Sequence, residues 1–99
     1  MQVAIVRFPL GETMSLERAK ELYSGYSVKY RNVAGLLTKY YVYGPDKRGG
    51  AVYIWESREH AEAQYTPEWY ASMTQRWGVR PEVELLESPV VVDNRVPEG

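Results

Sequence analysis

The chain has 99 residues, of which 44% are hydrophobic and 25% charged, and this is the composition of one folded domain and not of a disordered chain. With 12 Lys and Arg against 13 Asp and Glu, the net charge is -1, and the longest charged cluster is the run at 46–48, so a nucleic-acid partner is not expected. The absence of cysteine excludes disulfides, thiolate metal sites and cysteine nucleophiles.

The first third of the chain predicts a strand followed by a helix. Residues 2–8 are rich in β-branched side chains, which favour a strand. Ser15 predicts the start of a helix, since its hydroxyl can accept a hydrogen bond from the first turn, and apolar side chains then recur every three or four residues as far as Tyr26. Gly25 lies inside this pattern, so we expect the helix to bend or fray before Tyr30.

The middle of the chain predicts a hairpin and a second helix. Two β-prone runs at 35–43 and 51–55 flank a segment rich in glycine at 44–50, which we interpret as the turn. Ser57 then predicts a helix start. Pro67 follows a second capping residue, so this helix is expected to be kinked or split, and a glycine and a proline end it near residue 78.

The last part of the chain completes the fold prediction. Residues 82–93 predict a strand, with Pro89 at an edge or bulge, so that 1–93 form one domain and 94–99 a polar C-terminal tail. The order of elements predicts an α+β, ferredoxin-like βαββαβ sandwich, a four-stranded antiparallel sheet with helices on one face. The other face would be a large apolar patch, so we expect a homodimer that pairs through it.

A membrane partner is not expected. The longest unbroken apolar stretch is 3–6, and the N-terminus lacks the basic and apolar regions of a secretory signal. We therefore expect a cytoplasmic protein.

Two segments carry a resemblance to a known family. The runs GLLTKYY at 35–41 and GAVYIWES at 50–57, followed by a helix that contains alanine, resemble the YdhR-type monooxygenases of the dimeric α/β-barrel superfamily. The resemblance implies a homodimer with a cavity in each subunit, and an oxidoreductase that oxygenates a small planar aromatic or enolic compound without a cofactor. Because the same fold hosts other activities, an isomerase and a non-catalytic dimer that binds small hydrophobic molecules remain alternatives.

The aromatic composition points to a binding site. The chain has nine Tyr and three Trp but one Phe, so almost every large ring carries a polar group. Tyr53 and Trp55 share a strand face, and Tyr41 is expected opposite or diagonal to Tyr53, so that the three orient a substrate, with Tyr53 also a catalytic candidate. The alternative is that these rings pack in the core or at the dimer interface. The remaining substrate-binding candidates lie on the second helix: Trp69, Tyr70 and Trp77.

Two further residues are catalytic candidates. His60 is the only histidine and thus the default base, although its place just after the Ser57 cap also predicts a surface position. Arg7 shares a strand face with Val3 and Ile5, and either stabilises an anionic substrate in the pocket or ends the strand in solvent. One histidine without cysteine cannot form an ordinary zinc or iron centre, and no glycine-rich nucleotide motif occurs, so no metal or cofactor is expected.

Overall fold

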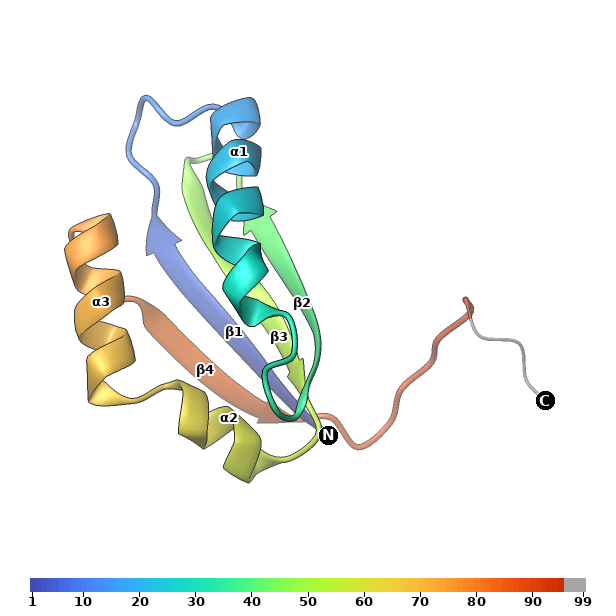
Figure 1. The fold of residues 1–99 in the computed structure, drawn as a ribbon. Helices are drawn as coiled ribbons and strands as arrows, with labels where there is room; N and C mark the ends of the chain where they lie inside the picture. Colours follow the sequence, from blue (N-terminus) through green and yellow to red (C-terminus); the bar gives the residue numbers. More distant parts are fainter. Residues whose placement is uncertain (96–99) are drawn as a thin grey trace.

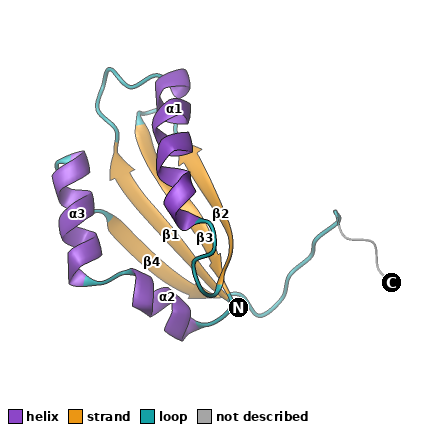
Figure 2. Ribbon diagram, viewed as in Figure 1, coloured by secondary structure: helices purple, strands orange, loops and turns teal. Residues whose placement is uncertain are grey.

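A computed structural model describes residues 1–95, and in it three helices cover one face of a four-stranded sheet (Figures 1 and 2). Within this part of the chain, no helix is long and apolar enough to cross a membrane. The strands are β1 (Gln2–Pro9), β2 (Leu36–Tyr43), β3 (Arg48–Trp55) and β4 (Glu82–Glu87). The helices are α1 (Leu16–Ser27), α2 (Arg58–Gln64) and α3 (Pro67–Trp77), and a 3-10 turn, η1 (Val28–Tyr30), follows α1.

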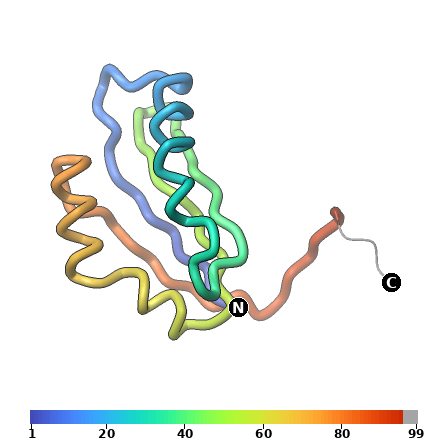
Figure 3. The backbone as a smooth tube through the Cα atoms, viewed as in Figure 1, coloured from blue at the N-terminus to red at the C-terminus, as the bar shows by residue number. Residues whose placement is uncertain are grey.

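The sheet has the strand order β2-β3-β1-β4, and every neighbouring pair is antiparallel. Figure 3 shows that α1 connects β1 to the β2–β3 hairpin, while α2 and α3 connect β3 to β4 on the same side of the sheet. This is the ferredoxin-like βαββαβ arrangement, so the predicted fold class is confirmed.

Side chains alternate between the two faces of the sheet. On the helix side, Ala4 and Val6 of β1 lie beside Tyr53 and Trp55 of β3, and all four are buried. Their sequence neighbours point to the open face, because successive side chains of a strand project in opposite directions. No helix within residues 1–95 covers that face. The open face carries these apolar residues: Val3, Ile5, Tyr40, Val42, Val52, Ile54 and Leu86.

The helices begin where the capping residues predict, and α3 also ends where predicted. The hydroxyl-bearing N-caps Ser15, Ser57 and Thr66 each accept a hydrogen bond from a backbone N–H in the first turn of their helix. The predicted split of the second helix is therefore confirmed, with Pro67 as the first residue of α3. Gly78 ends α3 with a φ of 85°, a left-handed conformation that favours glycine.

The predicted hairpin turn was too long, because β3 begins at Arg48 and not at residue 51. Gly49 and Gly50 belong to the strand, where they allow close packing. A Cβ atom at Gly49 would collide with the Tyr23 hydroxyl, and one at Gly50 would collide with the Val6 carbonyl of β1. The two glycines are thus sites of close approach within the sheet.

The predicted last strand was also too long, because β4 ends at Glu87 and not at residue 93. The N–H of Ser88 still donates to the Met1 carbonyl over 2.9 Å, but Pro89 has no N–H with which to continue the ladder. Residues 88–95 extend beyond the sheet without regular structure (Figure 3). Of the predicted tail, 96–99 lie outside the described residues, and the domain boundary at 93 stays a prediction.

Candidate functional site

Aromatic rings fill much of the space between the sheet and the helices. Tyr53 and Trp55 project from the same face of β3, as predicted, and their rings stack at 5.8 Å with an interplanar angle of 6°. They are 2% and 0% exposed, and the Trp55 indole N–H donates to the Tyr65 hydroxyl over 3.1 Å. Burial raises the pKa of Tyr53, so its hydroxyl stays protonated. Both side chains are therefore packed in the core.

Two adjoining hollows run along β2, between that strand and the segment formed by α1 and η1. One has a volume of about 480 Å³ and the other of about 370 Å³, and Ser27 and Tyr41 line both. We refer to the two together as the β2 groove. Its size is in the range of small-molecule sites. The smaller hollow is also lined by Tyr30 of η1 and by Lys39.

Lys39 is a residue of this site that the sequence analysis missed. It pairs with Tyr53 in the register of β2 and β3, and its Nζ lies 3.2 Å from the ring centroid of Tyr30, 4.2 Å from that of Tyr41 and 4.4 Å from that of Tyr53. No ion pair joins Lys39 to a carboxylate within residues 1–95. Burial, together with the positive charges of Lys29 and Arg76, lowers the pKa of Lys39 to about 6.

Tyr41 presents an unpaired hydroxyl beside the groove. Its ring stacks on that of Tyr23 at 4.7 Å, and it lies diagonal to Tyr53, one of the two arrangements predicted. The Tyr41 hydroxyl is buried without a hydrogen-bond partner among the described residues, whereas the Tyr23 hydroxyl donates to the Val42 carbonyl over 3.1 Å. Burial is the main cause that raises the pKa of Tyr41. A ligand oxygen is the kind of group that would satisfy this hydroxyl.

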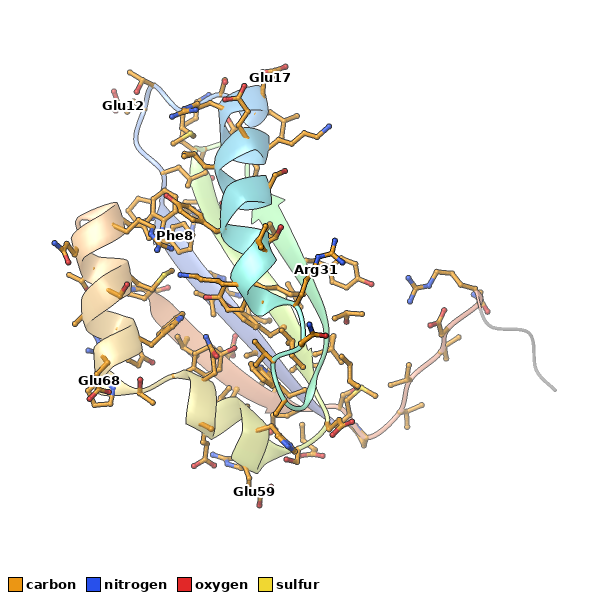
Figure 4. All side chains as sticks on the ribbon, viewed as in Figure 1. Phe8, Glu12, Glu17, Arg31, Glu59 and Glu68 are labelled. Atoms are coloured by element: carbon orange, nitrogen blue, oxygen red, sulfur yellow. The ribbon has the colours of Figure 1, made fainter. Side chains whose placement is uncertain are left out.

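Two indole N–H groups on α3 are unpaired in the same way. Trp77 stacks on Phe8 at 4.5 Å and meets the ring of Tyr26 edge-on at 6.3 Å, while Trp69 packs edge-on against Tyr65 at 4.9 Å. Figure 4 shows Phe8 between α1 and α3. Neither Nε1 atom has a partner within residues 1–95, although both are buried. Because indole nitrogen can only donate, both groups call for an acceptor.

Tyr70 lies apart from the β2 groove. Its ring lies 3.8 Å from the guanidinium of Arg80, and it lines a separate hollow of about 290 Å³ with Tyr65 and two apolar residues of β4. The structure therefore places Tyr70 at the opposite edge of the sheet from Tyr41.

The two other catalytic candidates also lie outside the groove. Arg7 is on the open face of the sheet, where its guanidinium lies 3.6 Å from Glu84. The Nδ1 of His60 lies 2.7 Å from the Ser57 hydroxyl, and its ring packs against Gly35, where a Cβ would collide with it. The structure does not bring either residue together with Tyr41.

Positive charge lies in and near the groove. Besides Lys39, the Arg76 guanidinium lies 4.0 Å from the ring centroid of Tyr26, and its charge acts on Lys39. Glutamates labelled in Figure 4 lie at the outside of the helices, among them Glu17, Glu59 and Glu68. Within residues 1–95, no three acidic or histidine side chains are placed to hold a metal. The arrangement suits a planar ligand with acceptor oxygens or a negative charge.

Comparison with known proteins identifies the fold. No protein-family model and no curated protein matches the chain. A monooxygenase of Streptomyces coelicolor, ActVA-Orf6, solved with the ligand nanaomycin D, is similar with a TM-score of 0.67 and 19% identity over 98% of this chain and 92% of that one. SnoaB of Streptomyces nogalater, a cofactor-independent oxygenase, is similar with a TM-score of 0.62 and 14% identity over 92% of this chain and 96% of that one.

A third structure, the NE2512 protein of unknown function from Nitrosomonas europaea, is similar with a TM-score of 0.69 and 14% identity over 99% of this chain and 95% of that one. The chain therefore shares the fold of these three proteins, and the fold that the sequence resemblance predicted is confirmed. Its assignment to the YdhR type stays a prediction.

Proposed function

We propose that the protein is a cofactor-independent monooxygenase that acts on a small planar aromatic or enolic compound bound on the helix side of the sheet. The observation that carries this proposal is the set of buried donors without partners, the hydroxyl of Tyr41 and the indole N–H groups of Trp69 and Trp77. Leaving such a group unpaired costs about 1–3 kcal/mol, so a ligand that supplies acceptors gains affinity from each one. Quinols, naphthols and enols supply such oxygens on a flat ring that stacks well on aromatic side chains.

The chemistry needs no resident redox group. A deprotonated naphthol is electron-rich enough to reduce oxygen, and 1-naphthol with one O₂ gives 1,4-naphthoquinone and one water, which balances atoms and electrons without another reductant. The protein would exclude water, hold the ring plane and stabilise negative charge with its donors. In this proposal the rings of Tyr41 and Trp77 hold the ring plane, and the cation of Arg76 stabilises the negative charge.

The similarities in fold support the oxygenase over other activities. One neighbour is named as a monooxygenase in complex with nanaomycin D and another as a cofactor-independent oxygenase. A specific observation favours the second candidate, a protein that binds such compounds without turnover: Arg7 and His60 both lie outside the β2 groove. The two candidates share a ligand class and differ in whether oxygen is consumed.

Oxygen uptake with a series of naphthols and quinols tests the proposal directly. We expect uptake that is saturable in substrate, with quinone formed in proportion to the oxygen consumed. The variant Trp77→Phe keeps the stack on Phe8 but removes the N–H, so it should lower the activity, whereas Glu17→Gln at the outside of α1 should leave it unchanged. Saturable binding without uptake would establish a binding protein, and rearrangement of an enone without uptake would establish an isomerase.

We also propose that the protein is a homodimer that pairs through the open face of the sheet. Val52 of β3 lies at the middle of this face, between Ile5 of β1 and Tyr40 of β2 in the register. Tyr40 and Val42 are 48% and 42% exposed, which is unusual for neighbouring large side chains on a sheet. A second copy of the chain offers a surface of the same apolar character, as a two-fold interface requires.

A further inference from the structure

We propose that Lys39 is the base of this site: it takes the proton from an acidic phenol or enol in the β2 groove and then holds the resulting anion. In this step the ligand O–H bond breaks, an N–H bond forms on Nζ, and the products are an ammonium and a phenolate or enolate. The inference deepens the proposed function, since it names the ionisation that must precede reaction with oxygen. It makes an acidic hydroxyl the defining feature of the substrate class.

The surroundings of Nζ support this role. Three tyrosine rings, from Tyr30, Tyr41 and Tyr53, lie within 4.4 Å of it, and no carboxylate pairs with it in the described part of the chain. Ring faces attract an ammonium but cannot accept a strong hydrogen bond from all of its protons. The three rings therefore surround a position that suits a cation, but no counter-ion lies beside it in the described residues. A ligand anion formed in the groove is the missing partner.

Charge balance explains why the amine is free to accept a proton. The groups that face Lys39 are Tyr30 and Lys29 from η1, Tyr41 from β2, Tyr53 from β3 and Arg76 from α3; none of them is acidic near neutral pH. Burial and the two cations lower the pKa of Lys39 to about 6, so at neutral pH most molecules carry the neutral amine. Proton transfer from the ligand creates a pair with no net charge, which costs less to bury than a lone ammonium.

A ligand in the groove can reach Lys39, and the Tyr41 hydroxyl is a second donor beside it. Lys39, Tyr30 and Tyr41 all line the same hollow of about 370 Å³, so a ligand can reach the amine from the groove. The buried hydroxyl of Tyr41 has no partner in the described residues, and its ring is one of the three around Nζ. We expect the ligand oxygen to accept from both groups. Lys29 cannot replace Lys39, since it is exposed and lies 5.7 Å from the Tyr30 ring.

The test uses 4-nitrophenol, whose anion absorbs in the visible, at a pH above the Lys39 pKa of about 6 but below that of the free probe. We expect the bound probe to show the anion band without net release of a proton to the buffer, because Nζ receives it. Lys39→Met should abolish the band and weaken binding of the probe by about tenfold or more, the effect of losing one ion pair. Binding of 4-nitroanisole, which cannot ionise, should change by less than about twofold.

Two further variants make the outcome decisive. Lys39→Arg keeps the positive charge but cannot take a proton, so it should bind the anion and release one proton to the buffer for each probe bound. Lys29→Met removes one of the two cations that lower the Lys39 pKa, but it should keep the anion band because Lys39 is still present to receive the proton. An anion band that persists in Lys39→Met, or a proton released by the unaltered protein, would overturn the inference, as would the absence of the band from the unaltered protein at saturation.

The experiments can contradict the proposed function and the inference about Lys39 independently. If the band depends on Lys39 but naphthols drive no oxygen uptake, Lys39 is an anion-binding base in a protein that is not an oxygenase. If naphthols drive uptake and Lys39→Met retains the same activity across the pH range, the oxygenase stands and its base lies elsewhere. If activity in Lys39→Met returns only at a pH where the naphthol ionises by itself, both are supported.

Discussion

Tyr41 and Tyr43 lie two residues apart on the same face of β2, yet only one of the two hydroxyls is paired. The Tyr43 hydroxyl donates to the Met14 carbonyl over 2.9 Å and accepts from the Lys47 Nζ over 2.9 Å. The Tyr41 hydroxyl is buried without a partner in residues 1–95. Equal side chains at equivalent strand positions therefore differ in what they contribute to folding and to binding.

Replacing each tyrosine by phenylalanine separates these contributions. Tyr41→Phe removes an unpaired buried hydroxyl, so the free energy of unfolding should rise by about 1 kcal/mol while the affinity for naphthols falls. Tyr43→Phe is the matched control and should lower the free energy of unfolding by about 1 kcal/mol, because it removes paired groups. Urea unfolding and ligand titration measure the two quantities. Equal loss of stability in both variants would contradict the role given to Tyr41.

The lowered pKa of Lys39 makes stability depend on pH. In the unfolded chain the amine titrates near 10.5, and in the folded protein near 6, so between these values the unfolded state binds more protons. The free energy of unfolding should therefore rise with pH through this window, by at most about 1.4 kcal/mol per unit from this residue. The ring faces around Nζ oppose the shift and make the observed slope smaller.

The measurement compares the unaltered protein with Lys39→Met from about pH 6 to about pH 9. The variant should be the more stable of the two at the low end, and the difference should shrink as the pH rises. Higher pH is avoided because burial raises the pKa of Tyr53 and of Tyr65, and a raised tyrosine pKa removes stability once the unfolded chain ionises. Parallel pH profiles of the two proteins would show that Lys39 titrates normally.

Gly50 should tolerate no side chain. Its φ is 149°, and a Cβ would collide with the Val6 carbonyl, which is backbone and cannot move without disturbing the pairing of β1 with β3. Gly50→Ala should lower the free energy of unfolding by about 3 kcal/mol or more. Gly25→Ala is the control: it is helical, meets nothing within 4 Å, and should raise the free energy of unfolding by about 0.5–1 kcal/mol.

A charge at the centre of the open face should separate the proposed dimer. Val52→Lys places an ammonium between Ile5 and Tyr40, where a partner's apolar surface would leave it unpaired. Sedimentation should show a dimer for the unaltered protein and a monomer for this variant, whereas Lys20→Glu on α1 should remain dimeric. A monomer at every concentration for the unaltered protein would remove the homodimer from the proposal.

The sequence predicted the parts of the fold that depend on local chemistry. Ser15, Ser57 and Thr66 are recognisable as caps because a hydroxyl before an apolar periodic segment satisfies the first free N–H groups of a helix. That Tyr53 and Trp55 lie on the same face of their strand also follows from strand geometry alone. Strand ends were less predictable: Gly49 is paired with β1 and β2, and a glycine is needed there because Tyr23 and Leu10, distant in sequence, pack where its side chain would be.

The candidate site could not be predicted in the same way, because it is formed by contacts between residues from different segments of the chain. Lys39 shares a face with Tyr41, and this follows from period two, but a lysine on a half-exposed strand usually points to water. Its importance appears only when Tyr30 from η1 and Tyr53 from β3 close around the amine. His60 and Arg7 were predicted as catalytic candidates from their chemistry alone. The three-dimensional packing instead places Lys39 beside the groove.

The alternation along β3 has a consequence for how such proteins diverge. Val52 and Ile54 project to the open face and Tyr53 and Trp55 to the helix side, so neighbouring codons serve different surfaces. Substitutions that alter the open face can therefore leave the helix side unchanged, and the reverse also holds. In the proposed dimer, duplicated copies of such a chain could thus change side chains on the helix side and still assemble through the open face.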